Sequence, residues 1–290
     1  MQMILLKKHK GPIFILANDK GDTDVLGSYE RFKEYIFQLT KIDLNSYKER
    51  QMKRRIDSLI TKHGIDSYAS YVGVLKTDKV FYNEFINYIT INVSEFYRNP
   101  EQWAMLEEKI LPYLFNNFGK DLKIWSAACS TGDEPYSLVM LLAKYIPLNM
   151  IKIIATDIDR LVMEKAKIGI YNKKSLKELP PQFIKDHFTK IDERSYQISD
   201  EIKSCVEFRH HDLIMDTYPD NCDLIVCRNV LIYFTDDAKN RIYNKFYNAL
   251  KDKGLLFVGS TEQMLGATQL GFQSLSSFFY MKYKTQYPNY

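Results

Sequence analysis

Long apolar runs are missing from this chain of 290 residues. A membrane-spanning helix needs about 18–20 consecutive apolar residues, and no run approaches that length. The longest run near the N-terminus, Pro12 to Ala17, is also shorter than a signal-peptide core of about 7–15 residues. The sequence therefore disfavours membrane insertion and export, and it predicts a cytoplasmic protein.

Cysteine is scarce, and a strong charge of either sign is absent. The four cysteines contain no CxxC pair and no paired histidine spacing, which disfavours zinc and favours buried free thiols in a reducing compartment. The net charge is only +4. Nucleic-acid-binding domains carry a stronger basic excess, so the composition permits an acidic partner without predicting nucleic acid.

What the chain does contain is two kinds of periodicity. Residues 28–90 show helical spacing of apolar residues in four segments, and Ser67 and Asp78 are predicted to be the N-caps of the third and fourth helices. The first two segments have inward sets Phe32, Tyr35, Ile36, Leu39 and Met52, Ile56, Leu59, Ile60. Residues 28–100 are thus predicted to form an all-α domain and its linker. Residues 1–27 are an unassigned extension, either loosely attached or paired as one strand.

After about Lys120, short apolar runs alternate with helical stretches. The predicted strands are Leu122–Ala128, Ile151–Ile158, Val206–Phe208, Cys222–Cys227 and Gly254–Gly259, and the predicted helices are Glu134–Tyr145, Leu161–Ile168 and Asp236–Leu250. This alternation predicts a doubly wound α/β domain over residues 101–290. The segment of about residues 172–205 is longer than an ordinary connection between a helix and a strand, so we interpret it as an inserted subdomain. Side-chain character alternates along Ser277–Lys284, which predicts an antiparallel edge strand.

The first predicted strand leads through a turn of small residues, Ala127 to Gly132, into a helix that begins with Asp133 and Glu134. Small residues let a ligand approach the backbone. Two carboxylates would repel a phosphate, so a cationic or amine-bearing ligand such as S-adenosylmethionine fits better. The alternative is that both carboxylates only complement the helix dipole, and the turn alone leaves both interpretations open.

Further polar residues follow the other predicted strands. Asp157 ends the second strand, where α/β nucleotide folds bind ribose hydroxyls, and Asp159 is predicted to cap the next helix. Asp212 ends the third strand and would accept from an adenine amine. Arg228 and Asn229 follow the fourth strand. Because the carboxyl ends of parallel strands share one edge, these groups are expected to meet in one crevice.

Four segments in order, Ile91–Asn99, Trp125–Ser137, Ala155–Asp159 and Cys227–Phe234, resemble the motifs of the CheR chemoreceptor methyltransferases. The resemblance covers about residues 28–284 and implies a Rossmann-like methyltransferase domain that methylates receptor glutamates. The implied cofactor is S-adenosyl-L-methionine, with S-adenosyl-L-homocysteine as product. The implied cofactor-binding residues are Asn92, Ser94, Arg98, Glu134, Asp157, Asp212, Leu213, Asn229 and Val230. Asp133 replaces the usual glutamate and Asp212 a common asparagine, which puts the contact made by Asp212 in doubt.

The chemistry of the acceptor suggests two catalytic residues. A glutamate is ionised at pH 7, so its attack on a methyl group needs orientation and not a base. Arg98 can orient both carboxylate oxygens with its planar guanidinium, and Tyr233 can donate a further hydrogen bond. The alternatives are an ion pair of Arg98 with Glu95 or Asp212, and core packing of Tyr233 beside Phe234.

The second helix places Arg50, Lys53 and Arg54 on one face, with Arg55 and Lys48 nearby. An exposed solvated face is the common interpretation of such a run. The resemblance implies instead a docking site, formed by Arg50, Lys53, Arg54 and Arg55, for the acidic methylation helices of membrane chemoreceptors. The insertion lacks the glycine-rich loop with which some members add a receptor C-terminal pentapeptide, so pentapeptide independence and a monomer are expected.

Three other functions would require different sequence features. A nucleic-acid amino-methyltransferase would carry an Asn/Asp-Pro-Pro-aromatic turn where this chain has Arg228 to Leu231, and a dinucleotide oxidoreductase would carry G-x-G-x-x-G. A non-catalytic S-adenosylmethionine-binding adaptor or sensor with a basic docking helix would keep the pocket, but it would need neither Arg98 nor Tyr233.

Overall fold

The computed structural model describes residues 28–283, so the expectations for residues 1–27 and for the end of the tail lie outside it. The N-terminal part is all-α, with helices α1 (Tyr29–Thr40), α2 (Glu49–Lys62), α3 (Tyr68–Thr77) and α4 (Lys79–Thr90) and the short η2 (Leu44–Ser46). Ser67 caps α3 by accepting from the Ser70 amide, and Asp78 caps α4 by accepting from Val80 and Phe81, as predicted. The apolar faces enclose one core around Phe32, Ile56 and Phe85.

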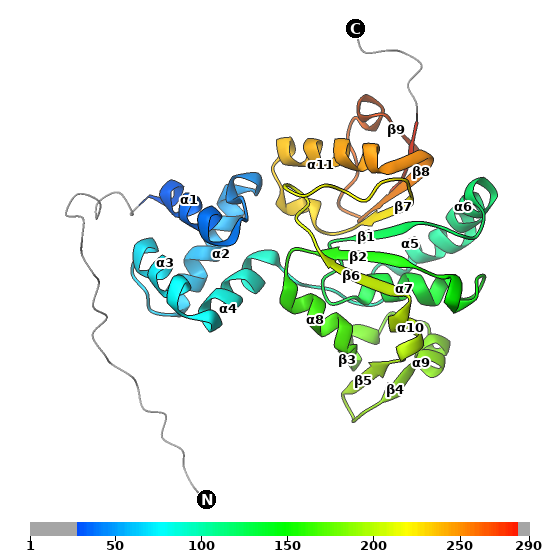
Figure 1. The fold of residues 1–290 in the computed structure, drawn as a ribbon, viewed down its shortest axis with the longest axis horizontal. Helices are drawn as coiled ribbons and strands as arrows, with labels where there is room; N and C mark the ends of the chain where they lie inside the picture. Colours follow the sequence, from blue (N-terminus) through cyan, green and yellow to red (C-terminus); the bar gives the residue numbers. More distant parts are fainter. Residues whose placement is uncertain (1–27, 284–290) are drawn as a thin grey trace, which may run out of the picture.

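The larger domain is built on a seven-stranded sheet in the order β6-β2-β1-β7-β8-β10-β9 (Figure 1). Its strands are β1 (Ile124–Ala127), β2 (Ile153–Asp157), β6 (Val206–His210), β7 (Cys222–Cys227), β8 (Leu250–Val258), β9 (Phe272–Ser276) and β10 (Phe279–Lys282). The first five strands in that order pair in parallel, and β8, β10 and β9 pair antiparallel. The predicted tail strand is antiparallel, but its position at the edge was wrong, because β9 lies outside it.

Both faces of this sheet are covered, because successive strand residues enter different cores. Ile124, Val226 and Phe257 pack with α7 (Asp133–Leu142) and with α5 (Pro100–Met105), η3 (Leu106–Ile110) and α6 (Leu111–Phe118). Trp125 and Cys227 point the other way and pack with α11 (Asp236–Ala249). The predicted doubly wound architecture is confirmed, although β8 begins at Leu250, earlier than the Gly254–Gly259 prediction.

Helix α8 (Arg160–Ile168) leads into a small unit that projects from one end of the domain (Figure 1). Its antiparallel sheet has the order β3-β5-β4, with β3 (Ile170–Asn172), β4 (Phe188–Lys190) and β5 (Ser195–Ile198). Three short helices, η5 (Lys173–Leu176), α9 (Pro181–His187) and α10 (Asp200–Ser204), complete it. Residues 172–205 thus contain the helix and small strands expected there, with the first strand starting at Ile170.

The helical domain contacts the larger domain through more than the linker. The Lys48 amide donates to the Tyr233 carbonyl (2.8 Å), and the Thr235 amide donates to the Ser46 carbonyl (2.9 Å). These bonds fix the loop before α2 against η6 (Leu231–Tyr233) and the residues that follow it. Across residues 28–283, no helix has the length and apolar character of a membrane span.

Candidate active site

A solvent-accessible pocket lies at the carboxyl ends of the parallel strands, and its space, with the adjoining open solvent, amounts to about 960 Å³. The linker after α4 and the loop before α2 complete its wall. Every residue predicted for cofactor binding or catalysis contributes to the lining: Asn92, Ser94, Arg98, Glu134, Asp157, Asp212, Leu213, Asn229, Val230 and Tyr233. The pocket thus brings together side chains that are up to 141 positions apart in the sequence, from Asn92 to Tyr233. The shared edge of parallel strands predicted this for Asp157, Asp212 and Asn229, whereas Asn92, Ser94 and Arg98 were implied by the family resemblance.

The turn after β1 explains why small residues are needed. Ala128, Ser130 and Gly132 all have positive φ, at 65°, 48° and 86°. This conformation is costly for residues with a side chain and is often retained at functional sites. A Cβ at Gly132 would lie 2.8 Å from the Cβ of Ala166, so a larger residue cannot be accommodated without movement. The turn places Ser130 and Glu134 at the pocket.

Asp157 is held at the end of β2 by two backbone donors. One carboxylate oxygen accepts from the Ser130 amide (2.8 Å) and the other from the Asp159 amide (2.9 Å). Burial raises the pKa of Asp157 from 3.8 to about 6, an effect that these hydrogen bonds partly oppose. A carboxylate has about four acceptor sites, so both oxygens can still accept from ligand hydroxyls.

Asp159 performs its predicted capping role and a second one. Its Oδ1 accepts from the Leu161 amide at the start of α8 (2.9 Å). Its Oδ2 accepts from the side chains of Asn87, Thr90 and Asn92 at 3.3, 3.2 and 2.9 Å. One buried carboxylate therefore joins α8 to the end of α4 and orients Asn92, whose amide oxygen accepts from the Ser130 hydroxyl (3.3 Å).

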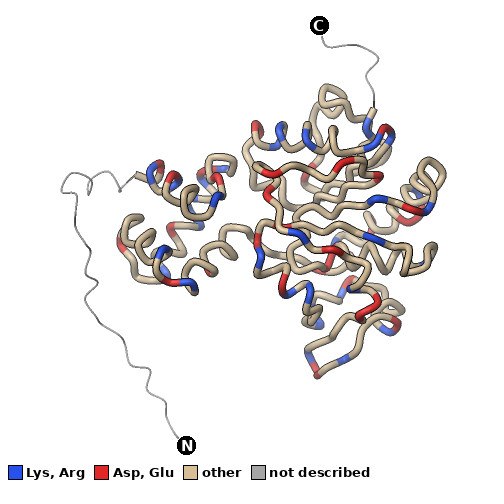
Figure 2. The backbone as a smooth tube through the Cα atoms, viewed as in Figure 1, with Lys and Arg blue, Asp and Glu red and all other residues tan. Residues whose placement is uncertain are grey.

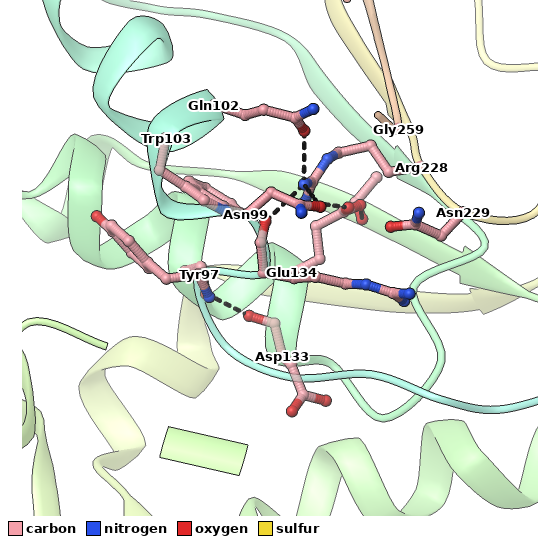
Figure 3. A network of polar contacts seen from close by, with 12 residues as sticks. Tyr97, Asn99, Gln102, Trp103, Asp133, Glu134, Arg228, Asn229 and Gly259 are labelled. Atoms are coloured by element: carbon pink, nitrogen blue, oxygen red, sulfur yellow. Dashed lines mark hydrogen bonds and ion pairs between the residues drawn. The ribbon is translucent and has the colours of Figure 1, made fainter. Parts of the chain in front are cut away.

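Glu134 belongs to a buried network around Arg228 (Figure 3). Its Oε1 accepts from the Ser126 hydroxyl (2.8 Å), and its Oε2 lies 3.5 Å from Nη1 of Arg228. Nη2 of Arg228 donates to the Arg98 carbonyl (2.6 Å) and to Oε1 of Gln102 (2.8 Å). Burial raises the pKa of Glu134 and lowers that of Arg228, while their mutual attraction opposes both shifts.

The two carboxylates at the start of α7 have different surroundings. Asp133 is buried outside the pocket lining and accepts from the hydroxyl of Thr131 in the turn, whereas Glu134 lines the pocket. The interpretation that both only complement the helix dipole therefore does not describe Glu134. The position of Arg228 after an apolar strand predicted its place at the crevice, but its ion pair with Glu134 was not predicted.

Glu262 is a second residue that sequence reasoning missed. Its buried carboxylate accepts from four backbone amides, those of Asn229, Leu231, Ile232 and Gly259. Asn229 has φ 60°, so this carboxylate supports a strained turn that carries Asn229, Val230 and then Tyr233. The available signal was an acidic residue three positions after the predicted strand that ends at Gly259.

Arg98 and Tyr233 are half-buried residues of the pocket lining. The Arg98 guanidinium donates to the Val93 carbonyl (3.1 Å), and Val93 is 72% exposed. Within residues 28–283, Arg98 forms no ion pair with Glu95 or Asp212; Glu95 lies instead 3.5 Å from Lys177. Tyr233 is half-buried beside the pocket, and Phe234 stacks on Tyr47.

Asp212 and Leu213 lie in the loop after β6. The Asp212 carboxylate accepts from the amides of Ile214 (2.7 Å) and Met215 (3.3 Å), and burial raises its pKa. The side chain therefore orders its own loop as well as facing the pocket. Leu213 is buried, and its carbonyl accepts from the Tyr218 hydroxyl (2.7 Å).

The four cations predicted for docking divide into three groups. Arg50 and Arg54 are exposed on α2, where both signs of charge are interspersed (Figure 2). Lys53 forms an ion pair with Asp57 (2.7 Å). Arg55 points to α4, where its guanidinium donates to the Tyr88 carbonyl and lies 4.6 Å from the Tyr88 ring centroid. Arg55 therefore has a structural contact that the other three do not share.

A parallel sheet with carboxylates at its strand ends is typical of enzymes that bind a nucleoside-containing cofactor. Residues 92–279 match the family described as CheR methyltransferase, SAM binding domain, and residues 27–90 match CheR methyltransferase, all-alpha domain. The chain belongs to the CheR methyltransferase family. It is a methyltransferase that binds S-adenosylmethionine.

Curated relatives agree with this assignment. The chemotaxis protein methyltransferases of Listeria innocua and Listeria monocytogenes are 40% and 41% identical to it over 259 residues. Each match covers 89% of this chain and 98% of the relative. The chemotaxis protein methyltransferase of Borreliella burgdorferi is 31% identical, with 83% and 89% covered. The chain is therefore related to proteins that act in chemotaxis.

The residues of the pocket fit this cofactor. Four carboxylates line it, from Glu95, Glu134, Asp157 and Asp212, against the guanidinium groups of Arg98 and Arg228. Burial raises the pKa of three of the four, and of these three only Glu134 has an ion-pair partner within residues 28–283, Arg228. A ligand with an ammonium and a sulfonium group supplies positive charge, and its sulfonium supplies the methyl group for transfer.

Proposed function

We propose that this chain methylates glutamate side chains of bacterial chemoreceptors, forming methyl esters and S-adenosyl-L-homocysteine. The observation that carries the proposal is the guanidinium of Arg98, which belongs to the lining of a carboxylate-rich pocket and donates to the carbonyl of the exposed Val93. The carboxylate of an acceptor glutamate can enter such a pocket only beside a cation, because an unpaired buried carboxylate would take up a proton. The relatives named chemotaxis protein methyltransferases support a receptor substrate.

In this proposal Arg98 binds and orients the acceptor. Within residues 28–283 its guanidinium donates one hydrogen bond, to the Val93 carbonyl, which leaves most of its five N–H donors for a carboxylate. The Arg228 hydrogen bond to its backbone carbonyl fixes the main chain of Arg98. The acceptor glutamate is already ionised at neutral pH, so the enzyme supplies orientation and exclusion of water and not a general base.

Tyr233 is proposed to donate a hydrogen bond to the acceptor and so to select the attacking oxygen. The Lys48 amide binds the Tyr233 carbonyl, and Glu262 accepts from the amides of the preceding turn. The backbone that carries the phenol is therefore fixed from both domains. The proposed cofactor roles of Asn92, Ser94, Glu134, Asp157, Asp212, Leu213, Asn229 and Val230 follow from their places in the lining.

We infer that receptor helices dock on the exposed face of α2, through Arg50 and Arg54 and with Lys53 as a paired neighbour. Arg55 is assigned to the α2–α4 contact and is left out of this surface. The β4–β5 connection supports pentapeptide independence, since residues 191–194 form a short turn in which Asp192 accepts from the amides of Arg194 and Ser195. Action in the cytoplasm as a monomer belongs to the same proposal.

The test is transfer of a labelled methyl group from S-adenosylmethionine to a purified receptor cytoplasmic fragment. The expected product releases labelled methanol in mild base, because a glutamyl methyl ester hydrolyses and an N-methyl group does not. A matched fragment with glutamine at the candidate glutamates is expected to accept no label. Base-stable label, or label on a nucleic acid and none on the receptor, would refute the proposal, and cofactor binding without any transfer would favour the adaptor.

A further inference from the structure

Tyr47 is a pocket residue contributed by the helical domain. It lies between η2 and α2, and it forms an isolated antiparallel bridge with Phe234. The two hydrogen bonds that flank it, from Lys48 to Tyr233 and from Thr235 to Ser46, hold its backbone against the larger domain. Its ring stacks on Phe234 with centroids 4.7 Å apart and an interplanar angle of 29°. The position of the ring is therefore set by backbone and side-chain contacts together.

The surroundings of the phenol identify the part of the pocket that it faces. Tyr47 lines the pocket together with Asp157, Asp212 and Leu213, which follow β2 and β6. Burial raises the pKa of Tyr47, and the negative charges of Asp212 and Asp157 raise it further. The phenol is consequently protonated at any physiological pH and is a hydrogen-bond donor. No hydrogen bond joins its hydroxyl to another residue within 28–283.

We propose that Tyr47 contacts the nucleoside half of bound S-adenosylmethionine, with its hydroxyl donating a hydrogen bond to the nucleoside and its ring closing that end of the pocket. The ammonium of the amino-acid half needs a carboxylate, and Glu134 is the carboxylate proposed for it. Glu134 belongs to the Arg228 network at the start of α7, so the amino-acid half lies there and not beside Tyr47. The helical domain therefore completes the cofactor site in addition to any role in docking. The inference rests on cofactor binding and not on the identity of the methyl acceptor.

Calorimetric titration of the full chain with two ligands tests this contact. S-adenosylhomocysteine carries both halves of the cofactor, and 5′-methylthioadenosine carries the nucleoside without the amino acid. Tyr47→Phe keeps the ring that stacks on Phe234 and removes only the hydroxyl. We expect it to weaken both ligands by the same factor, about five- to tenfold, as loss of one hydrogen bond of ordinary net strength does.

Tyr82→Phe is the matched control, since Tyr82 lies on α4 outside the pocket lining and its loss of a hydroxyl should leave both affinities unchanged. Unchanged affinities for Tyr47→Phe would overturn the proposal, and weakening of S-adenosylhomocysteine alone would overturn the nucleoside assignment. Hydrogen exchange on the unmodified chain gives an independent result. Binding of 5′-methylthioadenosine is expected to slow exchange of the Lys48 amide, and no slowing there would contradict the contact.

Discussion

The pocket and the outer face of α2 both carry charges with proposed functions, but these charges are buried and paired in the pocket and exposed to solvent on α2. The Arg228 side chain is 2% exposed and its guanidinium is bound to Glu134, Gln102 and the Arg98 carbonyl. Arg50 and Arg54 are exposed to solvent. A buried charge with several fixed partners cannot be removed alone, because its partners stay buried and unpaired. Exposed charges act at longer range, weakly and additively, and salt screens them.

Arg228→Ala should give the largest effect. It leaves the Glu134 carboxylate without its cation, and the Arg98 carbonyl keeps only its second donor, the Trp103 indole, so we expect a loss of about 3–5 kcal/mol in the free energy of unfolding. Urea denaturation measures this directly. The control is Arg209→Ala, which removes an exposed pair with Glu207 (side chains 51% and 62% exposed) and should cost less than about 1 kcal/mol. Equal losses of unfolding free energy in the two variants would contradict the claim that a buried, paired charge costs more to remove than an exposed one.

Reversal of the exposed charges on α2 should give an intermediate effect that depends on salt. Arg50→Glu together with Arg54→Glu is expected to slow receptor methylation by about tenfold at low ionic strength, and by much less at high ionic strength, because it reduces electrostatic steering. The affinity for S-adenosylhomocysteine should not change. Initial rates at several salt concentrations provide the measurement.

Two controls accompany that variant. Lys165→Glu with Lys167→Glu places the same charge change on α8 and should leave the rate unaltered. Arg55→Ala should lower the free energy of unfolding by about 1–2 kcal/mol, since it removes the bond to the Tyr88 carbonyl, without changing the salt dependence of the rate. A salt-independent loss of rate in the α2 variant would contradict docking on this face.

The smallest expected effect is the release of a fraction of a proton from Asp157 when the cofactor binds. Its pKa in the folded chain is raised to about 6 from 3.8, so the contribution of this group to stability is full below about pH 3.8 and is lost as the pH rises through 6. Ribose hydroxyls bind the ionised form, so cofactor binding near pH 6 should release about half a proton from this group, and near pH 8 almost none. Calorimetry in two buffers of different ionisation enthalpy measures the release. Equal release at both pH values would argue against a raised pKa at Asp157.

The sequence predicted those parts of the molecule that depend on local order. Asp157 is the last residue of β2, and Asp212 and Asn229 lie two positions after β6 and β7, so the rule that parallel strands end at one edge was enough to bring them together. Caps such as Ser67 and Asp78 are equally local. Strand β9 was missed because four of its five residues are polar or at least partly exposed and show no clear alternation.

The rest depends on contacts between distant segments. Glu262 binds backbone amides about 30 residues away, and Tyr47 reaches the pocket only because its loop pairs with residues 233–235. No spacing pattern reports such contacts. For the same reason Arg55 was grouped with its neighbours on α2, although its partner is a carbonyl on α4.

The central claim is that Arg98 orients the acceptor carboxylate, and Arg98→Ala tests it most directly. Single-turnover transfer to a receptor fragment is measured at saturating S-adenosylmethionine, beside calorimetric titration with S-adenosylhomocysteine. We predict a fall in the transfer rate of roughly 10²-fold or more, with cofactor affinity largely kept, because loss of orientation at the reacting centre has that size. Normal transfer at saturation with cofactor affinity lost would contradict the account and make Arg98 a cofactor-binding residue alone.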